Sequence, residues 1–173
     1  MGTLAALAGA LRYPAPDRLG ELQRGAAELA EAADVGRPFA AFLDEVSRLT
    51  LAEWEELHTR TLDLSPPVVL YVGHAIWGES YKRGEFMASL KRAEDAESVD
   101  PDGELPDHLL PVLLYLDTAA EPLPELVEVI GPALQRMRCD LEKAESENPY
   151  VGLLDAIRAA VGAAVDAPVR ASR

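Results

Sequence analysis

The sequence predicts an all-α protein that forms a single compact helical bundle. Apolar residues recur at helical spacing along nearly the whole chain, and no long stretch alternates as a β-strand does. Helix-capping signals also stand at the starts of several periodic segments. With 173 residues, of which 49% are hydrophobic, the chain is long enough for one domain with a sizeable core.

Four helices are expected in the first third of the chain, at about residues 4–11, 19–33, 38–49 and 50–64. Pro38 is expected in the first turn of the third helix, where its missing N–H loses no hydrogen bond. The segment Thr50-Leu51-Ala52-Glu53 is typical of a capping box, in which the hydroxyl and the carboxylate each accept a hydrogen bond from a free N–H. It therefore predicts the start of the fourth helix.

Two helices are expected in the middle of the chain, at about residues 66–77 and 80–93. Ser65-Pro66-Pro67 supplies a cap and a first-turn proline for the first of them. Gly78 ends that helix, and Ser80 can cap the next. The segment from Gly78 to Gly84 could be mistaken for an anion-binding loop, but no strand precedes it. We interpret it as an interhelical turn, with Lys82 or Arg83 in surface ion pairs.

The stretch Glu97–Pro106 holds four acidic residues, two prolines and one glycine, and predicts a mobile loop near residues 97–106. Asp107 is expected to cap the helix that follows, up to about Leu116. A long helix should run from about Glu125 to Glu147 with a kink at Gly131-Pro132, and Asn148-Pro149 should begin the last helix. The expected domain covers residues 1–166, and residues 167–173 are expected to be a frayed tail.

Composition excludes several classes of partner. Sixteen basic and thirty acidic side chains give a net charge of −14, which repels nucleic acid and anionic membranes. No apolar run approaches the ~20 residues of a membrane span, and no signal peptide is expected, because no basic region precedes the first apolar residues. Cys139 is the single cysteine, so a disulfide within the chain is impossible. We expect a cytoplasmic protein, with the monomer favoured.

No motif for catalysis stands out, so no catalytic residue is expected. Phosphate loops, dinucleotide glycine fingerprints and nucleophile elbows are absent from the sequence. Glu55 and His58 form one Glu-x-x-His unit, the helical element of di-iron bundles, but such sites need two of these units. A small helical metal-binding enzyme remains an alternative of another class. The preferred interpretation has no metal and no cofactor, with His58 packed on aliphatic neighbours.

Several polar and aromatic residues have two interpretations. Asp107 and His108 could form an acid–base pair, although an Asp before an apolar helix is more often its N-cap. His74 is interpreted as a hydrogen-bonded packing residue. Tyr71, Trp77 and Tyr115 belong to the core by default, but Tyr and Trp also anchor partner peptides in grooves.

Two groups of residues carry a resemblance to a known family. The first comprises His58-Thr59-Arg60-Thr61-Leu62-Asp63-Leu64, Leu70-Tyr71, His74, Gly78-Glu79-Ser80 and Arg83-Gly84. The second is Leu105-Pro106-Asp107-His108-Leu109, at an expected helix start. In this order and in an all-helical chain of this length, they resemble the nitrate reductase assembly chaperones, the NarJ group of the TorD-like family. The resemblance is clearest from His58 to Leu116.

The resemblance implies a chaperone without a cofactor of its own. Such a protein binds the N-terminal peptide of the catalytic subunit of a respiratory, molybdenum-containing nitrate reductase, assists molybdenum cofactor insertion, and delays membrane docking until assembly is complete. The residues expected at the peptide are Tyr71, His74, Trp77, Asp107, His108, Leu109 and Tyr115. A chaperone for another molybdopterin oxidoreductase, of the dimethyl sulfoxide or selenate reductase type, remains the alternative.

Overall fold

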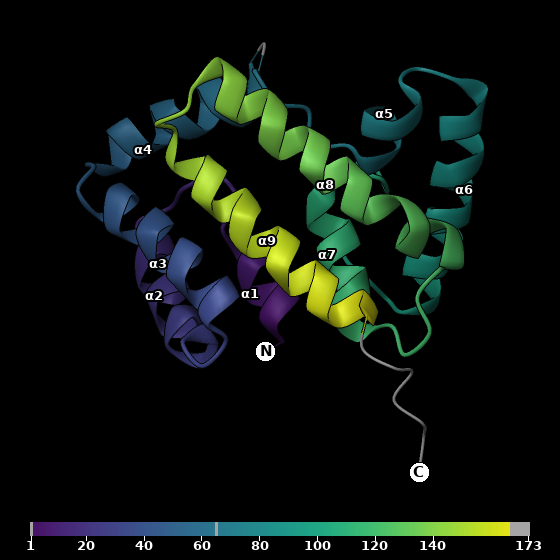
Figure 1. Ribbon diagram of the computed structural model, residues 1–173, viewed down its shortest axis with the longest axis horizontal. Coiled ribbons are helices and arrows are strands. Elements are labelled where there is room, and N and C mark those ends of the chain that lie inside the picture. The colour runs from purple at the N-terminus through teal and green to yellow at the C-terminus, as the bar shows by residue number, and fades with distance from the viewer. Residues whose placement is uncertain (1, 65, 167–173) are drawn as a thin grey trace.

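The computed structural model describes residues 2–64 and 66–166, and in this part of the chain it is all-α (Figure 1). The prediction of an all-helical fold is therefore confirmed. The elements are α1 (Thr3–Gly9), α2 (Arg18–Leu29), α3 (Ala33–Ser47), α4 (Leu51–His58), the π-helical turn η1 (Thr59–Asp63), α5 (Val72–Trp77), α6 (Tyr81–Ala96), α7 (Leu109–Thr118), α8 (Pro124–Ala144) and α9 (Pro149–Asp166). Within the described residues, no helix is both long and apolar enough to cross a membrane.

The helix α9 organises the bundle. It packs against α3, α8 and α1, while α1 packs in turn against α7. Figure 1 shows α2 and α3 on one side of α9, and α5 and α6 on the opposite side beyond α8. The short α5 is held against α8 and α6, so segment 71–77, which carries three of the seven expected site residues, lies at one end of the bundle (Figure 1).

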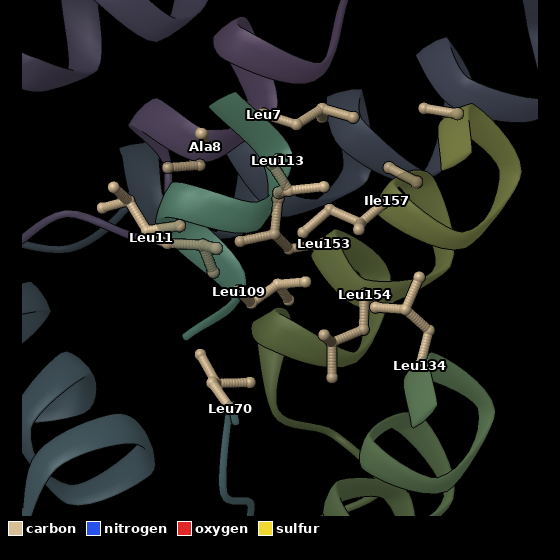
Figure 2. Close-up of a cluster of buried hydrophobic side chains, with 14 of the residues drawn as sticks. Leu7, Ala8, Leu11, Leu70, Leu109, Leu113, Leu134, Leu153, Leu154 and Ile157 are labelled. Atoms are coloured by element: carbon tan, nitrogen blue, oxygen red, sulfur yellow. The ribbon is translucent and has the colours of Figure 1, made fainter. Parts of the chain in front are cut away.

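The core is made almost entirely of aliphatic side chains from helices distant in sequence. In Figure 2, Leu7 of α1, Leu113 of α7 and Ile157 of α9 meet in one cluster, and all three are buried. One polar contact joins α4 to α9, because the buried Trp54 indole N–H donates to the Tyr150 hydroxyl at 3.2 Å. A buried indole needs such an acceptor, so this contact lets a large aromatic pair fill the core without an unsatisfied donor.

Three predicted helix starts are confirmed. Thr50 and Glu53 form both hydrogen bonds of the capping box, and the Ser80 hydroxyl accepts from the Arg83 N–H at 3.3 Å. The Asn148 side chain accepts from the Tyr150 N–H at 3.0 Å at the start of α9. These signals act within a few residues, which is why the sequence alone reveals them.

The helix expected at residues 66–77 is wrong in its first half. Only Val72–Trp77 is helical, and Tyr71 instead forms an isolated antiparallel bridge with His108. The Leu109 N–H donates to the Leu70 carbonyl at 2.8 Å, and the Val72 N–H donates to the Asp107 carbonyl at 2.7 Å. The segment around His108, 37 positions away in the chain, thus forms hydrogen bonds with backbone groups that would otherwise belong to a helix. This is a tertiary contact, and helical periodicity in the sequence does not predict it.

Other boundaries differ by a few residues. Pro38 lies inside α3 rather than in its first turn, because the helix already begins at Ala33. The helix α8 contains Pro132 and ends at Ala144, before the predicted Glu147. The predicted end near Leu64 is close, but the last turn before it is the π-helical η1. Ser65 and the predicted tail at residues 167–173 lie outside the described residues.

The loop at residues 97–106 contacts the rest of the bundle through two of its acidic side chains. Asp102 lies 3.3 Å from the Arg12 guanidinium, and the Tyr71 hydroxyl donates to Glu104 at 3.5 Å. Asp102 and Gly103 both have positive φ, at 53° and 81°, which turns the chain sharply. Mobility of this loop remains a prediction.

One buried acid forms no ion pair within the described part of the chain. Glu94 of α6 is 2% exposed, and its Oε1 atom makes no hydrogen bond to the described residues. Burial raises its pKa to about 7, because the charged carboxylate loses its hydration. The folded state therefore keeps a proton on Glu94 that the unfolded chain releases near its usual pKa of 4.5.

This proton should make stability depend on pH. Between about pH 4.5 and pH 7 the folded state binds more protons than the unfolded state, so Glu94 lowers the free energy of unfolding as pH rises through this window. The variant Glu94→Gln should lose this pH dependence. Above pH 7 its free energy of unfolding should be higher than that of the parent protein by about 1–3 kcal/mol, since one pKa unit corresponds to about 1.4 kcal/mol. Urea unfolding across this pH range measures it. The exposed Glu85→Gln is the control, and a Glu94→Gln effect that does not vary with pH would contradict the prediction.

Candidate functional site

The candidate site is built around a buried ion pair between α6 and the segment before α7. Arg83 and Asp107 are 6% and 0% exposed. The guanidinium donates through Nε to Oδ2 at 2.8 Å and through Nη2 to Oδ1 at 3.2 Å, which is the bidentate geometry that suits these two groups. The hydrogen bonds to Asp107 raise the pKa of Arg83 further above its usual value. Of the two residues expected in surface ion pairs, Lys82 forms one with Glu125 at 2.6 Å, whereas Arg83 is buried.

The sequence predicted that Asp107 caps α7, and this prediction is wrong. His108 is the N-cap, and its Nδ1 accepts from the Leu110 N–H at 3.2 Å. Asp107 is drawn inward because Arg83 satisfies its carboxylate, leaving the neighbouring imidazole for the cap. Burial lowers the pKa of His108, which favours the neutral ring that this acceptor role requires, with the proton on Nε2.

Gly73 is what lets the ion pair sit against α5. A Cβ atom at this position would lie 2.8 Å from Oδ2 of Asp107 and 3.0 Å from Cγ of Arg83. Both neighbours are held by their mutual hydrogen bonds, so neither can move aside freely. The absence of a side chain at Gly73 is therefore part of the site.

A second, exposed layer covers the ion pair. The Arg83 Nη1 donates to Glu79 at 2.5 Å, and the same Glu79 oxygen lies 3.1 Å from Nδ1 of His74. His74 is consequently half-buried and paired with a carboxylate, not enclosed among apolar side chains. Glu79 itself is exposed to solvent.

The aromatic residues of the site form a half-buried surface. The rings of Tyr71 and His108 meet edge to face at 5.2 Å, and the Arg83 guanidinium lies 5.3 Å from the Tyr71 ring. Trp77 packs against Phe86 at 5.0 Å, with the Lys82 ammonium 5.6 Å from its ring. Tyr71, His74, Trp77 and His108 are all half-buried in the structure.

The remaining predicted site residues are in the interior. Leu109 is 0% exposed and belongs to the main core, and Asp107 lies beneath the surface in its ion pair. Tyr115 is also buried, and its hydroxyl accepts from the Leu123 N–H at 3.0 Å, which holds the turn between α7 and α8. Of the seven predicted site residues, four therefore lie at the surface and three are buried beneath it.

The Glu-x-x-His pair is not brought together as a metal site. The buried His58 ring contacts the Leu11 carbonyl through Nε2 at 3.1 Å, whereas Glu55 lines a different groove. Within the described part of the chain, no group of three or more histidine, cysteine or acidic side chains has a geometry suited to a metal ion.

Sequence reasoning missed Arg83 and Gly73. The signal for Arg83 was present, because Arg83, Phe86 and Leu90 follow helical spacing on the buried face of α6. No local signal identified Gly73, since its constraint comes from a carboxylate 34 positions away.

No protein-family model matches this chain, and no curated protein does.

The ion pair should be essential to stability. Asp107→Ala leaves the Arg83 charge buried with only the exposed Glu79 as its partner, and it should lower the free energy of unfolding by about 3–5 kcal/mol. Urea denaturation measures this loss. The double variant Arg83→Met with Asp107→Leu should recover much of it, because no buried charge remains.

The matched control is Asp44→Ala, which breaks an exposed ion pair with Arg48 and should cost about 0.2–1 kcal/mol. If Asp107→Ala costs no more than this control, the ion pair is not the support described above.

Proposed function

We propose that this protein is a chaperone that binds a segment of another protein, and specifically the N-terminal peptide of the catalytic subunit of a molybdenum-containing nitrate reductase. In this role it assists molybdenum cofactor insertion and complex assembly in the cytoplasm before membrane docking. It acts by binding and carries no catalytic residue and no cofactor.

One observation carries the proposal. The two sequence groups that resemble the nitrate reductase assembly chaperones, 58–84 and 105–109, are joined by the Arg83–Asp107 ion pair. Side by side with this buried pair, the half-buried rings of Tyr71 and His108, which are 37 positions apart in the chain, are in contact. Because residues of both groups lie together in the fold, they can act on the same ligand, although they are far apart in the sequence.

The character of this surface supports binding of a polypeptide. Its half-buried Tyr and Trp side chains are of the types that supply much of the affinity in protein interfaces. The net charge of −14 attracts basic segments and speeds their encounter. A client peptide with apolar anchors and basic residues matches both properties.

The first test asks which enzyme is the partner. A tagged nitrate reductase catalytic subunit, expressed in the native host, should retain the chaperone on purification, and a subunit without its N-terminal segment should not. Retention only by a dimethyl sulfoxide or selenate reductase would favour the alternative client. Retention by none of these enzymes would contradict the proposal.

Calorimetric titration with the reductase's N-terminal peptide tests the mechanism. Binding should weaken with salt without disappearing, because the Debye length falls from ~10 Å at 0.1 M to ~3 Å at 1 M while apolar contacts persist. A peptide with its Lys and Arg residues changed to Gln is the control and should bind more weakly at low salt. No binding at either salt concentration, or binding that strengthens steadily with salt, would contradict this mechanism.

A further inference from the structure

The helix α6 ends in a Schellman motif, in which the chain leaves the helix through one residue of left-handed conformation. The Val99 N–H donates to the Glu94 carbonyl at 3.0 Å, and the Ser98 N–H donates to the Asp95 carbonyl at 3.2 Å. Ser98 is the left-handed residue, with a φ of 57°. Glycine is the usual residue at this position because it has no Cβ atom, so Ser98 makes this helix end weaker than the common form.

Glu94 occupies a position of this motif that is usually apolar. The residue that accepts the longer of the two hydrogen bonds and the residue that donates it commonly make a hydrophobic contact. Here these residues are Glu94 and Val99. Val99 is half-buried and packs against the hydrophobic core, and Glu94 is 2% exposed. An ionisable group therefore stands where the motif normally has a hydrocarbon side chain.

The charged groups near Glu94 already have partners. On its own helix, Lys91 forms an ion pair with Asp95. In the segment before α7, Asp107 is held by Arg83. The Oε1 atom of Glu94 makes no hydrogen bond to the described residues. Burial without a partner disfavours the carboxylate and raises the pKa of Glu94 to about 7.

The loop that begins at this motif reaches the candidate site. Asp102 of the loop pairs with Arg12, and Glu104 accepts from the Tyr71 hydroxyl. Figure 1 shows α6 at the edge of the bundle, where it packs against α5 and α7. At the start of the loop, the packing of Val99 and the two hydrogen bonds of the motif hold the chain against the bundle.

We propose that the Schellman motif at the end of α6 is a proton-controlled helix end. With Glu94 neutral, Val99 stays packed and the start of loop 97–106 stays on the bundle. When Glu94 releases its proton to water, the carboxylate moves into solvent, Val99 leaves the core, and the start of the loop separates. This inference goes beyond the proposed function, because it holds whichever partner the protein binds.

The opening should depend on pH in one direction. The closed motif favours the protonated acid, whereas a solvated Glu94 releases its proton near the usual pKa of 4.5. Opening therefore releases one proton between about pH 4.5 and pH 7. The opening equilibrium should rise about ten-fold per pH unit in this range and become constant above about pH 7.

Amide hydrogen exchange of the whole protein, followed by NMR from pH 5 to pH 8, measures this opening. After correction for the intrinsic exchange rate, the opening equilibrium at Ser98 and Val99 should rise about a hundred-fold from pH 5 to pH 7. Low concentrations of urea should not change it, because a local opening exposes little surface. An opening that does not vary with pH would overturn the proposal. So would the urea dependence of Leu154, a core residue of α9, at Ser98 and Val99, because it would mean that they exchange only by global unfolding.

Three variants identify the group that titrates. Glu94→Gln cannot ionise, and its opening equilibrium should be low and constant from pH 5 to pH 8. The matched control is Glu97→Gln, which removes an exposed carboxylate from the same turn and should keep the pH dependence. Ser98→Gly should lower the opening equilibrium about five-fold at every pH, because glycine adopts the left-handed conformation without strain.

The pH series of the parent protein decides the proposal even where Glu94→Gln fails to fold, which circular dichroism checks. The same pH dependence in Glu94→Gln as in the parent protein would overturn the assignment to Glu94. Loss of the pH dependence in Glu97→Gln as well would indicate a general effect of charge and would also overturn it.

Discussion

The Arg83–Asp107 ion pair is the constraint on which the rest of the site depends. It draws Asp107 away from the helix start, leaves His108 to cap α7, and holds the start of α7 against α6. The backbone beside it then pairs with residues 70–72, so α5 begins only at Val72, and Leu70 and Tyr71 are not helical. An apolar pair of similar volume can be as stable as a buried ion pair. The specific contribution of these charges is therefore alignment, because a bidentate contact fixes the mutual orientation of two segments.

Local signals explain why the fold class and three of the helix starts could be predicted. A capping box at Thr50 or a serine cap at Ser80 involves atoms three residues apart, so its sequence pattern is complete in itself. The buried stripe of α6 was also visible as spacing, but it begins with Arg83 and ends with Glu94. The spacing of apolar residues alone includes Phe86 and Leu90 but leaves out the buried charged residue at each end. Spacing indicates which face is buried, whereas the partner that makes a buried charge acceptable lies elsewhere in the chain.

The candidate site was less accessible from sequence for the same reason. Tyr71 and His108 became neighbours through a bridge between segments 37 positions apart, and before the structure only the resemblance grouped them. Asp107 and Tyr115 were named as site residues, yet both are buried, and Tyr115 holds the turn between α7 and α8. A cavity beside His58 is lined by residues of four separate segments, and the π-helical turn among them has no sequence signature comparable to a cap. Contacts of this kind depend on the final packing.

The turn at Thr59–Asp63 has a consequence for how such a protein can diverge. A π-helical turn contains one residue more than an α-helical turn between the same hydrogen-bonded groups. Deleting one residue here would restore regular α-helical hydrogen bonding, yet it would rotate the residues at the end of this turn by about 100° around the axis of α4. The side chain of Asp63 would leave His58, while the buried stripes of α1, α7 and α9 would be untouched. A single-codon deletion or insertion is therefore a short evolutionary path between a chain in which Asp63 lies beside His58 and a chain in which it does not.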